Sequence, residues 1–397
     1  MKNYIQISKL NLIIFDEAHW VLKKDKPSSH PYRLIMNMYK KQMANIPWDS
    51  RPRILGLTAS ILNPQLKMDM FYKTIDEIEK IYNAKVESEF TDEYFKEARV
   101  FVEISDNIQF SSNLMKQKNQ IESIEKLLNF LESKKKNKKA SDYNLVRSLV
   151  NSIEKVKDIC YNKMGPWFAI EALKIYTLSL SRMTQLELKS ILMNSFQFIQ
   201  DEITEHFLCT SHTCGSNFSF KHELYSAKIK SLLKILKIFR NNLNCLVFVQ
   251  ERIEANLIYR FLLLTSQKYE KEFGFLKPGF ICGSPAKDFI RFDKNTTEFK
   301  RKFETKELNV MITTSVLEEG IDLPLCNIVI RYDFPSTFRS FIQSKGRARN
   351  ANSFFLLMVD ENNELLNWKS LLSDYFKIEQ LIINISSRNE TNSLNSI

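Results

Sequence analysis

Short apolar runs alternate with amphipathic stretches along this chain, and the spacing of the apolar residues changes twice. Three apolar runs stand out in the first hundred residues: "LIIF" at 12–15, "RILGL" at 53–57 and "RVFVEI" at 99–104. A continuous run of this kind is typical of a strand buried on both faces of a parallel sheet. We therefore predict an α/β section over residues 1–104, with these runs as its strands.

From residue 105 to 222 the apolar positions recur at helical spacing instead, which predicts a helical insertion. The recurring positions are Ile121, Ile124, Leu128 and Leu131, followed by Leu145, Leu149, Ile153 and Val156. The basic run "SKKKNKKA" at 133–140 separates the two helices. We interpret it as a solvated turn, with a phosphate-contacting loop as the alternative.

After residue 223 strands and helices alternate, which predicts a doubly wound parallel sheet. The predicted strands are "CLVFV", "GFICG", "NVMIT", "CNIVIRY" and "FFLLMV", and the predicted helices lie near 226–240, 251–264, 296–306 and 336–348. The fold class is thus α/β, with an incomplete lobe at 1–104, a helical insertion at 105–222 and a complete lobe at 223–361. Residues 362–397 are predicted to be a helical extension that ends in a disordered Ser/Asn-rich tail, "SSRNETNSLNSI".

Composition narrows the class of protein. The 397 residues, 44% of them hydrophobic, can fill two or three cores, and no apolar run is long enough to span a bilayer. The N-terminus does not have the pattern of a signal peptide. Six scattered cysteines, several inside apolar runs, indicate reduced thiols in an intracellular protein. The net charge of +11 favours a polyanionic partner such as nucleic acid, although a Lys-rich composition without a binding role is the alternative.

Two acidic residues follow the first predicted strand in "FDEAH" at 15–19. Asp16 and Glu17 would lie at the carboxyl end of that strand, where open α/β sheets place their ligands. A nucleotide-hydrolysing enzyme needs one carboxylate on its magnesium and a second near the attacking water. No G-x-x-x-x-G-K-[ST] loop precedes Leu12 in the chain.

Three further segments follow predicted strands or lie on a predicted helix. In "RILGLTASILN", the hydroxyls of Thr58 and Ser60 can hydrogen-bond the acidic motif and report its state to the neighbouring lobe. In "MITTSVLEEGIDLPLCNIVIRYD", hydroxyls at a strand end suit phosphate binding, Gly320 frees the backbone, and Asp322 can accept hydrogen bonds from a ribose. The hydroxyl residues of that second segment are Thr313, Thr314 and Ser315.

The third segment, "FIQSKGRARN", carries Gln343, Lys345, Arg347 and Arg349 on or beside a helix. Guanidinium groups delivered from a second lobe stabilise the charge on a transferred phosphoryl group. Each segment alone is compatible with an ordinary surface loop. In this order across two α/β lobes, they indicate a nucleotide-hydrolysing site between lobes.

These segments resemble a known family. "FDEAH", "GLTAS", "TTSVLEEGIDLP" and "QSKGRAR" resemble motifs II, III, V and VI of superfamily 2 helicases. With "HPYRLIMNMY", "MGPWFA" and "NIVIRYDFPSTFRSFIQSKGRAR", they resemble more narrowly the helicase region of the Dicer family of dsRNA-processing ribonucleases. The resemblance covers most of residues 11–385 and is weakest in the helical insertion. It implies two RecA-like lobes, the first one incomplete, an insertion that grips double-stranded RNA, and ATP with Mg²⁺ as cofactors.

The resemblance also implies roles for single residues. Asp16 and Glu17 become the metal and water carboxylates, and Arg347 and Arg349 face the phosphates. The remaining assignments are nucleotide contacts for His19, Gly320, Asp322 and Gln343, coupling between sites for Thr58 and Ser60, and RNA contacts for Thr313, Thr314 and Ser315. We expect a cytoplasmic location, with the nucleus as an alternative, and a dsRNA-binding protein as a candidate partner on the insertion.

The chain departs from the family at several points. Ala18 stands where Dicers commonly carry Cys, which we expect to matter little, because this position does no acid chemistry. The phosphate-cradling loop with its Lys, the ribonuclease domains, the PAZ domain and the dsRNA-binding domain have no counterpart. Because the acidic motif is intact, we expect a fragment rather than a degenerate relative. We expect the chain alone to lack RNA-stimulated ATPase activity.

Two other function classes stay open. The chain fits a non-catalytic RNA-binding or interaction module, and "FDEAH" is equally natural in a superfamily 2 DNA translocase. The residues of the segments "QSKGRAR" and "HPYRLIM" favour the RNA-processing members of the superfamily over the DNA translocases.

Two further features have a functional and a structural interpretation. "HFLCTSHTC" offers the zinc ligand types His206, Cys209, His212 and Cys214, but the paired second segment of a usual structural zinc site is missing, so we favour ordinary thiols and imidazoles. Trp167 in "MGPWFA" has the chemistry to stack on a base, and a core or lobe-contact role is the favoured interpretation.

Overall fold

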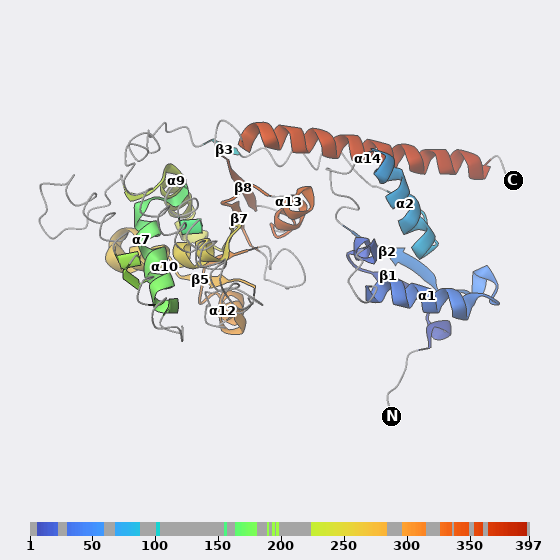
Figure 1. The fold of residues 1–397 in the computed structure, drawn as a ribbon, viewed down its shortest axis with the longest axis horizontal. Helices are drawn as coiled ribbons and strands as arrows, with labels where there is room; N and C mark the ends of the chain where they lie inside the picture. The colour runs from blue at the N-terminus through green and yellow to red at the C-terminus, as the bar shows by residue number, and fades with distance from the viewer. Residues whose placement is uncertain are drawn as a thin grey trace, which may run out of the picture. The chain divides into compact units, whose positions relative to one another are not determined.

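The computed structural model describes most of the chain outside the predicted helical insertion (Figure 1). The described residues are 6–22, 30–58, 68–87, 101–103, 155–156, 163–180, 189, 193–194, 196–197, 224–283, 296–314, 326–335, 337–348, 353–359 and 364–394. They belong to two compact units: residues 1–99, 335–346 and 362–397 form the first, and residues 100–334 and 347–361 form the second. Each unit is therefore built from segments that are not continuous in the sequence, unlike the predicted domains.

The first unit contains a two-stranded parallel sheet. Strand β1 (Leu12–Phe15) pairs with β2 (Arg53–Gly56), so that Phe15 lies opposite Gly56. The helices of this unit are η1 (Ile7–Lys9), η2 (Ala18–Leu22), α1 (Pro31–Met43), η3 (Trp48–Ser50), α2 (Met68–Tyr82), α13 (Phe338–Lys345) and α14 (Glu364–Leu394). Pro at the first position of α1 and the side chain of His30, which accepts a hydrogen bond from the Tyr32 backbone, define where α1 begins.

The prediction that the first strand is buried on both faces is wrong for β1. Phe15 is buried among side chains of α1 and α2, whereas Leu12 is 47% and Ile14 56% exposed. Successive side chains of a strand point to opposite faces. The core of this unit gathers around Phe15 and leaves Leu12 and Ile14 outside it.

Helix α14 is part of the first unit's core rather than a separate extension. Ile382 is buried in the same cluster as Phe15, and Trp368 packs on Phe341 of α13 with ring centroids 4.5 Å apart. The helix runs to Leu394, so the predicted disorder of the tail is wrong for 386–394. That stretch contains no Pro or Gly to interrupt the helical hydrogen bonds.

The second unit contains a six-stranded sheet in the order β3-β8-β7-β4-β6-β5, and all its pairings are parallel. The strands are β3 (Phe101–Glu103), β4 (Cys245–Phe248), β5 (Pro278–Ile281), β6 (Val310–Thr313), β7 (Ile328–Arg331) and β8 (Phe354–Val359). Four of them, from β4 to β7, are buried along their whole length. The predicted α/β class with parallel sheets is thereby confirmed.

One strand lies in an unexpected place. β3 comes from the run "RVFVEI", which the sequence predicted as part of the first lobe. In the structure it pairs with β8, so that Phe101 lies opposite Leu357 in the larger sheet. An apolar run predicts that a strand will be buried, but it carries no information on which sheet supplies the neighbour.

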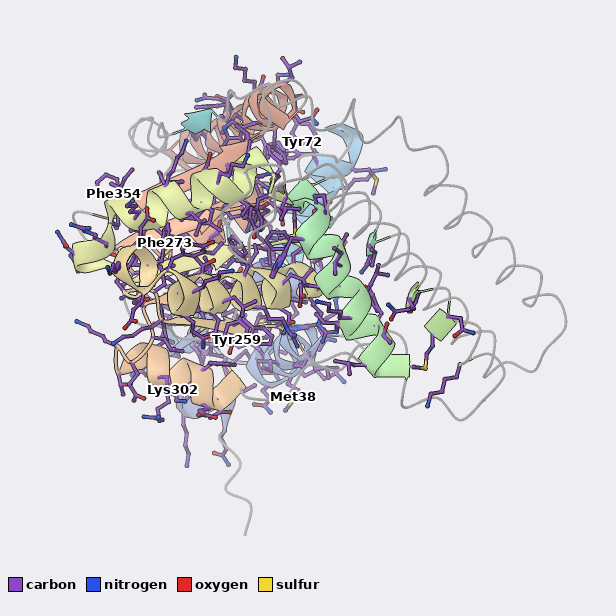
Figure 2. All side chains as sticks on the ribbon, turned by 90° about the vertical axis from the view of Figure 1, so that its left-hand side faces the viewer. Met38, Tyr72, Tyr259, Phe273, Lys302 and Phe354 are labelled. Atoms are coloured by element: carbon purple, nitrogen blue, oxygen red, sulfur yellow. The ribbon has the colours of Figure 1, made fainter. Side chains whose placement is uncertain are left out.

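Helices cover the larger sheet, and their start signals are visible in the sequence. They are α7 (Pro166–Leu180), α9 (Ala227–Ile238), α10 (Arg252–Lys268), α11 (Glu270–Phe273) and α12 (Thr296–Glu304), with η6 (Arg240–Asn242) after α9. Ser226 caps α9 by accepting from Ile229 N–H, and Glu251 with Glu254 forms a capping box on α10. Figure 2 labels Tyr259 of α10. Its ring packs on Phe280 and Phe299, with centroids 5.0 and 5.8 Å away.

Helix α7 is the largest described piece of the predicted helical insertion, and it packs into the second unit. Phe168, Ala172 and Tyr176 are buried in the same core cluster as the strands and α10. Most of residues 105–222 lie outside the described part of the chain. Of the helices that the structure describes, none carries an apolar stretch sufficient to cross a bilayer.

Candidate functional site

The acidic motif forms a tight turn at the end of β1. Asp16 Oδ1 accepts a hydrogen bond of 2.9 Å from Glu17 N–H, and Glu17 has a φ of 50°. The left-handed region is uncommon for a residue with a long side chain, so this turn is a strained one. Ala18 N–H donates to Leu57 O at 2.8 Å, which ties the turn to the residue after β2.

Gly56 is the residue that permits this close approach. A Cβ added to Gly56 would lie 2.9 Å from the Cβ of Ala18, closer than Cβ atoms come in practice. The Gly in "GLTAS" therefore lets the end of β2 contact the turn that carries Asp16 and Glu17.

The Glu17 carboxylate is held by side chains from two distant segments. Oε2 lies 3.2 Å from His19 Nδ1, and Oε1 accepts a hydrogen bond of 3.1 Å from Gln343 Nε2 on α13. The hydrogen bond from His19 lowers the pKa of Glu17, and the bond from Gln343 adds to this, together outweighing the effect of burial. Glu17 is therefore a carboxylate at neutral pH.

His19 connects the acidic motif to the T-A-S segment. Its ring is buried, and Nδ1 lies 2.8 Å from Thr58 Oγ1 as well as near Glu17. A proton on Nδ1 can be shared between the two oxygens, because a hydroxyl accepts as readily as it donates. The hydrogen bond expected between the acidic motif and the T-A-S segment is thus present at Thr58, while its role in coupling stays a prediction.

The structure gathers five of the predicted site residues in one place: Asp16, Glu17, His19, Thr58 and Gln343. Five other predicted site residues lie outside the described residues, as do the four candidate zinc ligands. They are Ser60, Ser315, Gly320, Asp322 and Arg349 with the tail of motif VI, and the zinc candidates His206, Cys209, His212 and Cys214. Among the described residues, no group of three or more His, Cys, Asp or Glu side chains could hold a metal ion.

Two of the three predicted RNA contacts, those at the end of β6, are interior residues. Thr313 and Thr314 are buried, and the Thr313 hydroxyl donates to Thr314 O at 3.0 Å. Arg347 lies near Cys326 in the second unit. Burial raises the pKa of the Cys326 thiol to about 12, and the charge of Arg347 opposes that rise. The roles of these residues toward RNA and phosphate remain predictions.

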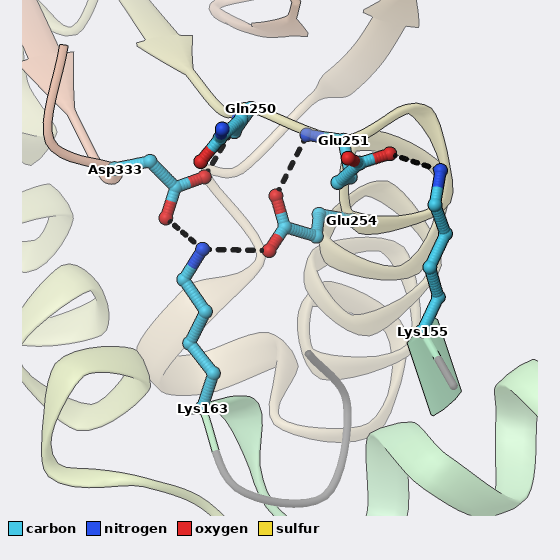
Figure 3. A network of polar contacts seen from close by, with 6 residues as sticks. All are labelled: Lys155, Lys163, Gln250, Glu251, Glu254 and Asp333. Atoms are coloured by element: carbon cyan, nitrogen blue, oxygen red, sulfur yellow. Dashed lines mark hydrogen bonds and ion pairs between the residues drawn. The ribbon is translucent and has the colours of Figure 1, made fainter. Parts of the chain in front are cut away.

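A second polar cluster lies in the second unit, near the ends of β4 and β7 (Figure 3). The ammonium of Lys163 lies between two buried carboxylates, 2.8 Å from Glu254 Oε1 and in contact with Asp333 Oδ1. Asp333 Oδ2 accepts a hydrogen bond of 2.6 Å from Gln250 N–H, and Glu254 Oε2 accepts one of 2.9 Å from Glu251 N–H. The cluster therefore fixes the segment before α7 to the strand ends.

The two carboxyl groups of this cluster differ in their protonation at neutral pH. Burial raises the pKa of Glu254 to about 8, and the neighbouring Asp333 carboxylate contributes to the rise. Burial also acts to raise the pKa of Asp333, but the charge of Lys163 brings it below its ordinary value. At neutral pH, Glu254 is hence the carboxyl that holds a proton, while Asp333 and Lys163 form the ion pair. Sequence reasoning missed this cluster, because a single Lys in a helical section carries no distinctive spacing.

The segment "KMGPWF", which contains Lys163, packs closely against the rest of the second unit. Gly165 has a φ of 114°, and a Cβ there would lie 2.6 Å from Leu224 O. Trp167 packs on Phe168 and Phe261, with ring centroids 4.9 and 5.4 Å away. The favoured interpretation of Trp167 as a core contact is thus confirmed.

Comparison with known proteins adds to this geometry. Residues 227–352 match the family model of the helicase conserved C-terminal domain. Across 97% of its length the chain is 27% identical to the endoribonuclease Dicer of Danio rerio, and across 96% it is 27% identical to the endoribonuclease dcr-1 of Caenorhabditis elegans. Across 90% it is 29% identical to the endoribonuclease Dicer homolog 2a of Oryza sativa subsp. japonica. The chain spans only 23%, 21% and 26% of the length of these relatives.

Among solved structures, the chain is similar to the crystal structure of the Hef helicase domain of Pyrococcus furiosus. That likeness covers 92% of this chain and 74% of the other, with 18% identity and a TM-score of 0.45. The fold assignment therefore stands on the strand pairing described above. The sequence similarity across nearly the whole chain, with the match to the helicase C-terminal domain inside it, supports the resemblance seen in the motifs: the chain is similar to the helicase region of Dicer-type proteins of superfamily 2.

Proposed function

We propose that this chain is the helicase portion of a Dicer-like dsRNA-processing endoribonuclease, in which ATP hydrolysis is coupled to dsRNA binding and translocation. The observation that carries the proposal is the ionised Glu17 carboxylate, held at the end of β1 by His19 and by Gln343 of α13. A carboxylate in such a place can orient and deprotonate the water that attacks a γ-phosphate.

Asp16 and Glu17 fit a magnesium nucleotide in the types of atom they offer. Mg²⁺ prefers oxygen ligands and is often held by one or two carboxylates together with substrate phosphates. Asp16 is exposed and is the carboxylate free to face the ion, whereas Glu17 is held by its neighbours. When bound, the ion would neutralise charge on the phosphates.

The coupling residues are Thr58, His19 and Gln343. Thr58 contacts His19, His19 contacts Glu17, and Gln343 donates to Glu17. A change at either the T-A-S segment or α13 would therefore move the same carboxylate. This chain of contacts supports a role in which the state of the nucleotide is transmitted to the RNA-binding surface.

Double-stranded RNA is the proposed polyanion. The net charge of +11 supports an electrostatic partner, and the curated relatives carry the name endoribonuclease. An A-form duplex is recognised largely through its phosphates and 2′-hydroxyls. Binding should therefore weaken steeply with salt and tolerate changes of RNA sequence, and filter binding over a salt series measures both properties.

The catalytic half of the proposal is tested by nucleotide binding and RNA-stimulated hydrolysis. Both are measured on the purified chain and on a chimera in which the chain replaces the matching segment of the Danio rerio relative. Glu17→Gln should lower kcat in the chimera by about 100-fold or more while nucleotide binding persists. The matched control is Asp76→Asn, which removes an exposed carboxylate of the same unit. RNA binding without hydrolysis in either protein would identify a non-catalytic RNA-binding module instead.

A further inference from the structure

Two tyrosine hydroxyls contact the backbone on either side of Glu17. Tyr32 of α1 donates to Asp16 O at 2.8 Å, and Tyr82 at the end of α2 donates to Ala18 O at 2.8 Å. Both rings also pack on Phe15, each with its centroid 5.0 Å from that of the phenylalanine. The last residue of β1 and the turn after it are thus flanked by the same pair of side chains.

These contacts fix consecutive peptide groups of the turn. The carbonyl of the 16–17 peptide accepts from Tyr32, the N–H of the 17–18 peptide donates to Leu57 O, and the carbonyl of the 18–19 peptide accepts from Tyr82. The backbone dihedrals of Glu17 lie between the first two of these groups. Glu17 keeps its φ of 50° within this frame, although its Cβ disfavours the left-handed region.

Each tyrosine is itself held in place. The backbone N–H of Tyr32 donates to the His30 ring at 3.3 Å, and the next residue, Arg33, donates to Glu77 of α2 at 2.8 Å. Tyr82 is buried, and burial raises the pKa of its hydroxyl well above its ordinary value. The Tyr82 hydroxyl therefore remains a donor at physiological pH.

We propose that Tyr32 and Tyr82 are positioning residues that hold Glu17 in its left-handed turn, so that its carboxylate faces His19 and Gln343. We call these two tyrosines the clamp. The part that the clamp plays in catalysis rests on the proposed role of Glu17 in hydrolysis. Its effect on the backbone conformation of Glu17 does not rest on that role, because this conformation can be measured without nucleotide. The segment "HPYR" thereby acquires a physical role: its tyrosine braces the acidic motif from the adjacent helix.

The clamp is tested on the chain itself with Tyr32→Phe, Tyr82→Phe and the double variant, all of which keep the ring against Phe15. The matched control is Tyr39→Phe, because Tyr39 is a buried tyrosine of the same unit whose hydroxyl donates to Pro52 O at 2.8 Å, away from the turn. Glutamate-selective labelling allows NMR couplings that report the sign of φ at Glu17. Amide exchange at Ala18 reports how often the turn opens.

In the clamp variants Glu17 should leave the left-handed region, and exchange at Ala18 should become about fivefold faster for each hydroxyl removed. In Tyr39→Phe both readouts should stay at wild-type values, although its thermal stability falls by a similar amount. A positive φ at Glu17 and unchanged exchange in both single variants would overturn the clamp. Should the double variant fail to fold, the two single variants decide the question alone.

Failure of the clamp and failure of the proposed function give different results. Where the wild-type chimera hydrolyses ATP, the clamp variants should lower kcat and leave KM unchanged, since they displace a group that acts on the water. Altered φ at Glu17 in the variants, together with a wild-type chimera that lacks ATPase activity, would support the clamp and reject the proposed function. Normal φ at Glu17 in the variants of an active chimera would reject the clamp and leave the proposed function standing.

Discussion

Gln343 donates a hydrogen bond of 3.1 Å to the carboxylate of Glu17, although 326 residues separate them in the sequence. The two residues lie in the same compact unit, because residues 335–346 pack with the first hundred residues rather than with the sheet that precedes them. Motif VI and motif II of the helicase pattern are therefore joined by a direct contact. The pKa of Glu17 is lowered chiefly by the hydrogen bond from His19, and the amide of Gln343 adds to this effect.

Gln343→Glu should destabilise the first unit at neutral pH by about 1 kcal/mol, because a second carboxylate then faces Glu17 without a donor. The pKa of wild-type Glu17 is lowered, so its contribution to stability is present above the ordinary glutamate pKa and is lost as pH falls through the folded value. In the variant this trend should weaken or reverse, because acid removes the repulsion. Chemical denaturation over a pH series measures the difference.

Gln343→Met serves as the control for that prediction, since it removes the donor without adding charge. It should lie between the wild type and Gln343→Glu at neutral pH and should show no gain of stability in acid. Equal stability of all three proteins at every pH would mean that the contact is too weak to matter.

The larger sheet could be predicted from the sequence because its strands are continuous apolar runs with helices between them. β4, β6 and β7 are buried on both faces, so their continuous apolar runs predict their burial correctly. The same logic failed for β1, whose apolar run predicts the same burial although Ile14 lies outside the core. β3 shows a second limit, since burial of a run does not identify the strand beside which it will pair.

The site residues that belong to a recognisable sequence motif could be predicted. The residues that contact the site from other segments of the chain could not. Asp16, Glu17, Thr58 and Gln343 lie in short segments with recognisable spacing. Tyr32 and Tyr82 were missed, because a tyrosine on an amphipathic helix looks like any core residue and only the folded chain places its hydroxyl. Contacts across long sequence separations leave no local pattern.

Gly165→Ala should destabilise the second unit by about 2 kcal/mol or more. The residue has a φ of 114°, and the added Cβ would lie 2.6 Å from Leu224 O, so the loop before α7 must move. Gly346→Ala is the control, because Gly346 has helical dihedrals and its added Cβ would lie 3.3 Å from the nearest atom. Thermal unfolding should separate the two variants clearly, and equal stability would contradict the strained docking of this segment.

Trp167→Ala should lower the stability of the second unit without changing affinity for RNA. Its ring packs on Phe261 and Tyr225, so truncation leaves a gap among aromatic side chains and should cost about 2 kcal/mol or more. A tryptophan that stacked on a base would instead lose about 1 to 3 kcal/mol of binding free energy. Filter binding at a temperature where both proteins are folded distinguishes the two roles.

Lys163→Met should destabilise the second unit by about 3 to 5 kcal/mol at a pH near 9, because it removes the ammonium that lies between two buried carboxylates. Lys155→Met is the matched control. Its ion pair with Glu251 is 2.6 Å long but partly exposed, and such pairs contribute about 0 to 1 kcal/mol. Urea unfolding of both variants at one pH provides the comparison, and similar losses would show that burial of the Lys163 cluster has little energetic effect.

Glu254→Gln should flatten the dependence of stability on pH. The folded-state pKa of Glu254 is about 8, above its ordinary value of 4.5, so the folded protein binds this proton more tightly than the unfolded chain does. That contribution to stability is fully present below the ordinary pKa and is lost as pH rises through the folded value. Wild-type stability should therefore fall between about pH 5 and about pH 9, and the glutamine variant, which keeps the size and cannot titrate, should lose much of this slope. Asp333 does not produce the same trend, because its lowered pKa places its titration in acid. Denaturation series at matched ionic strength measure the two slopes, and parallel curves for wild type and variant would show that Glu254 is ionised in the folded protein throughout this range.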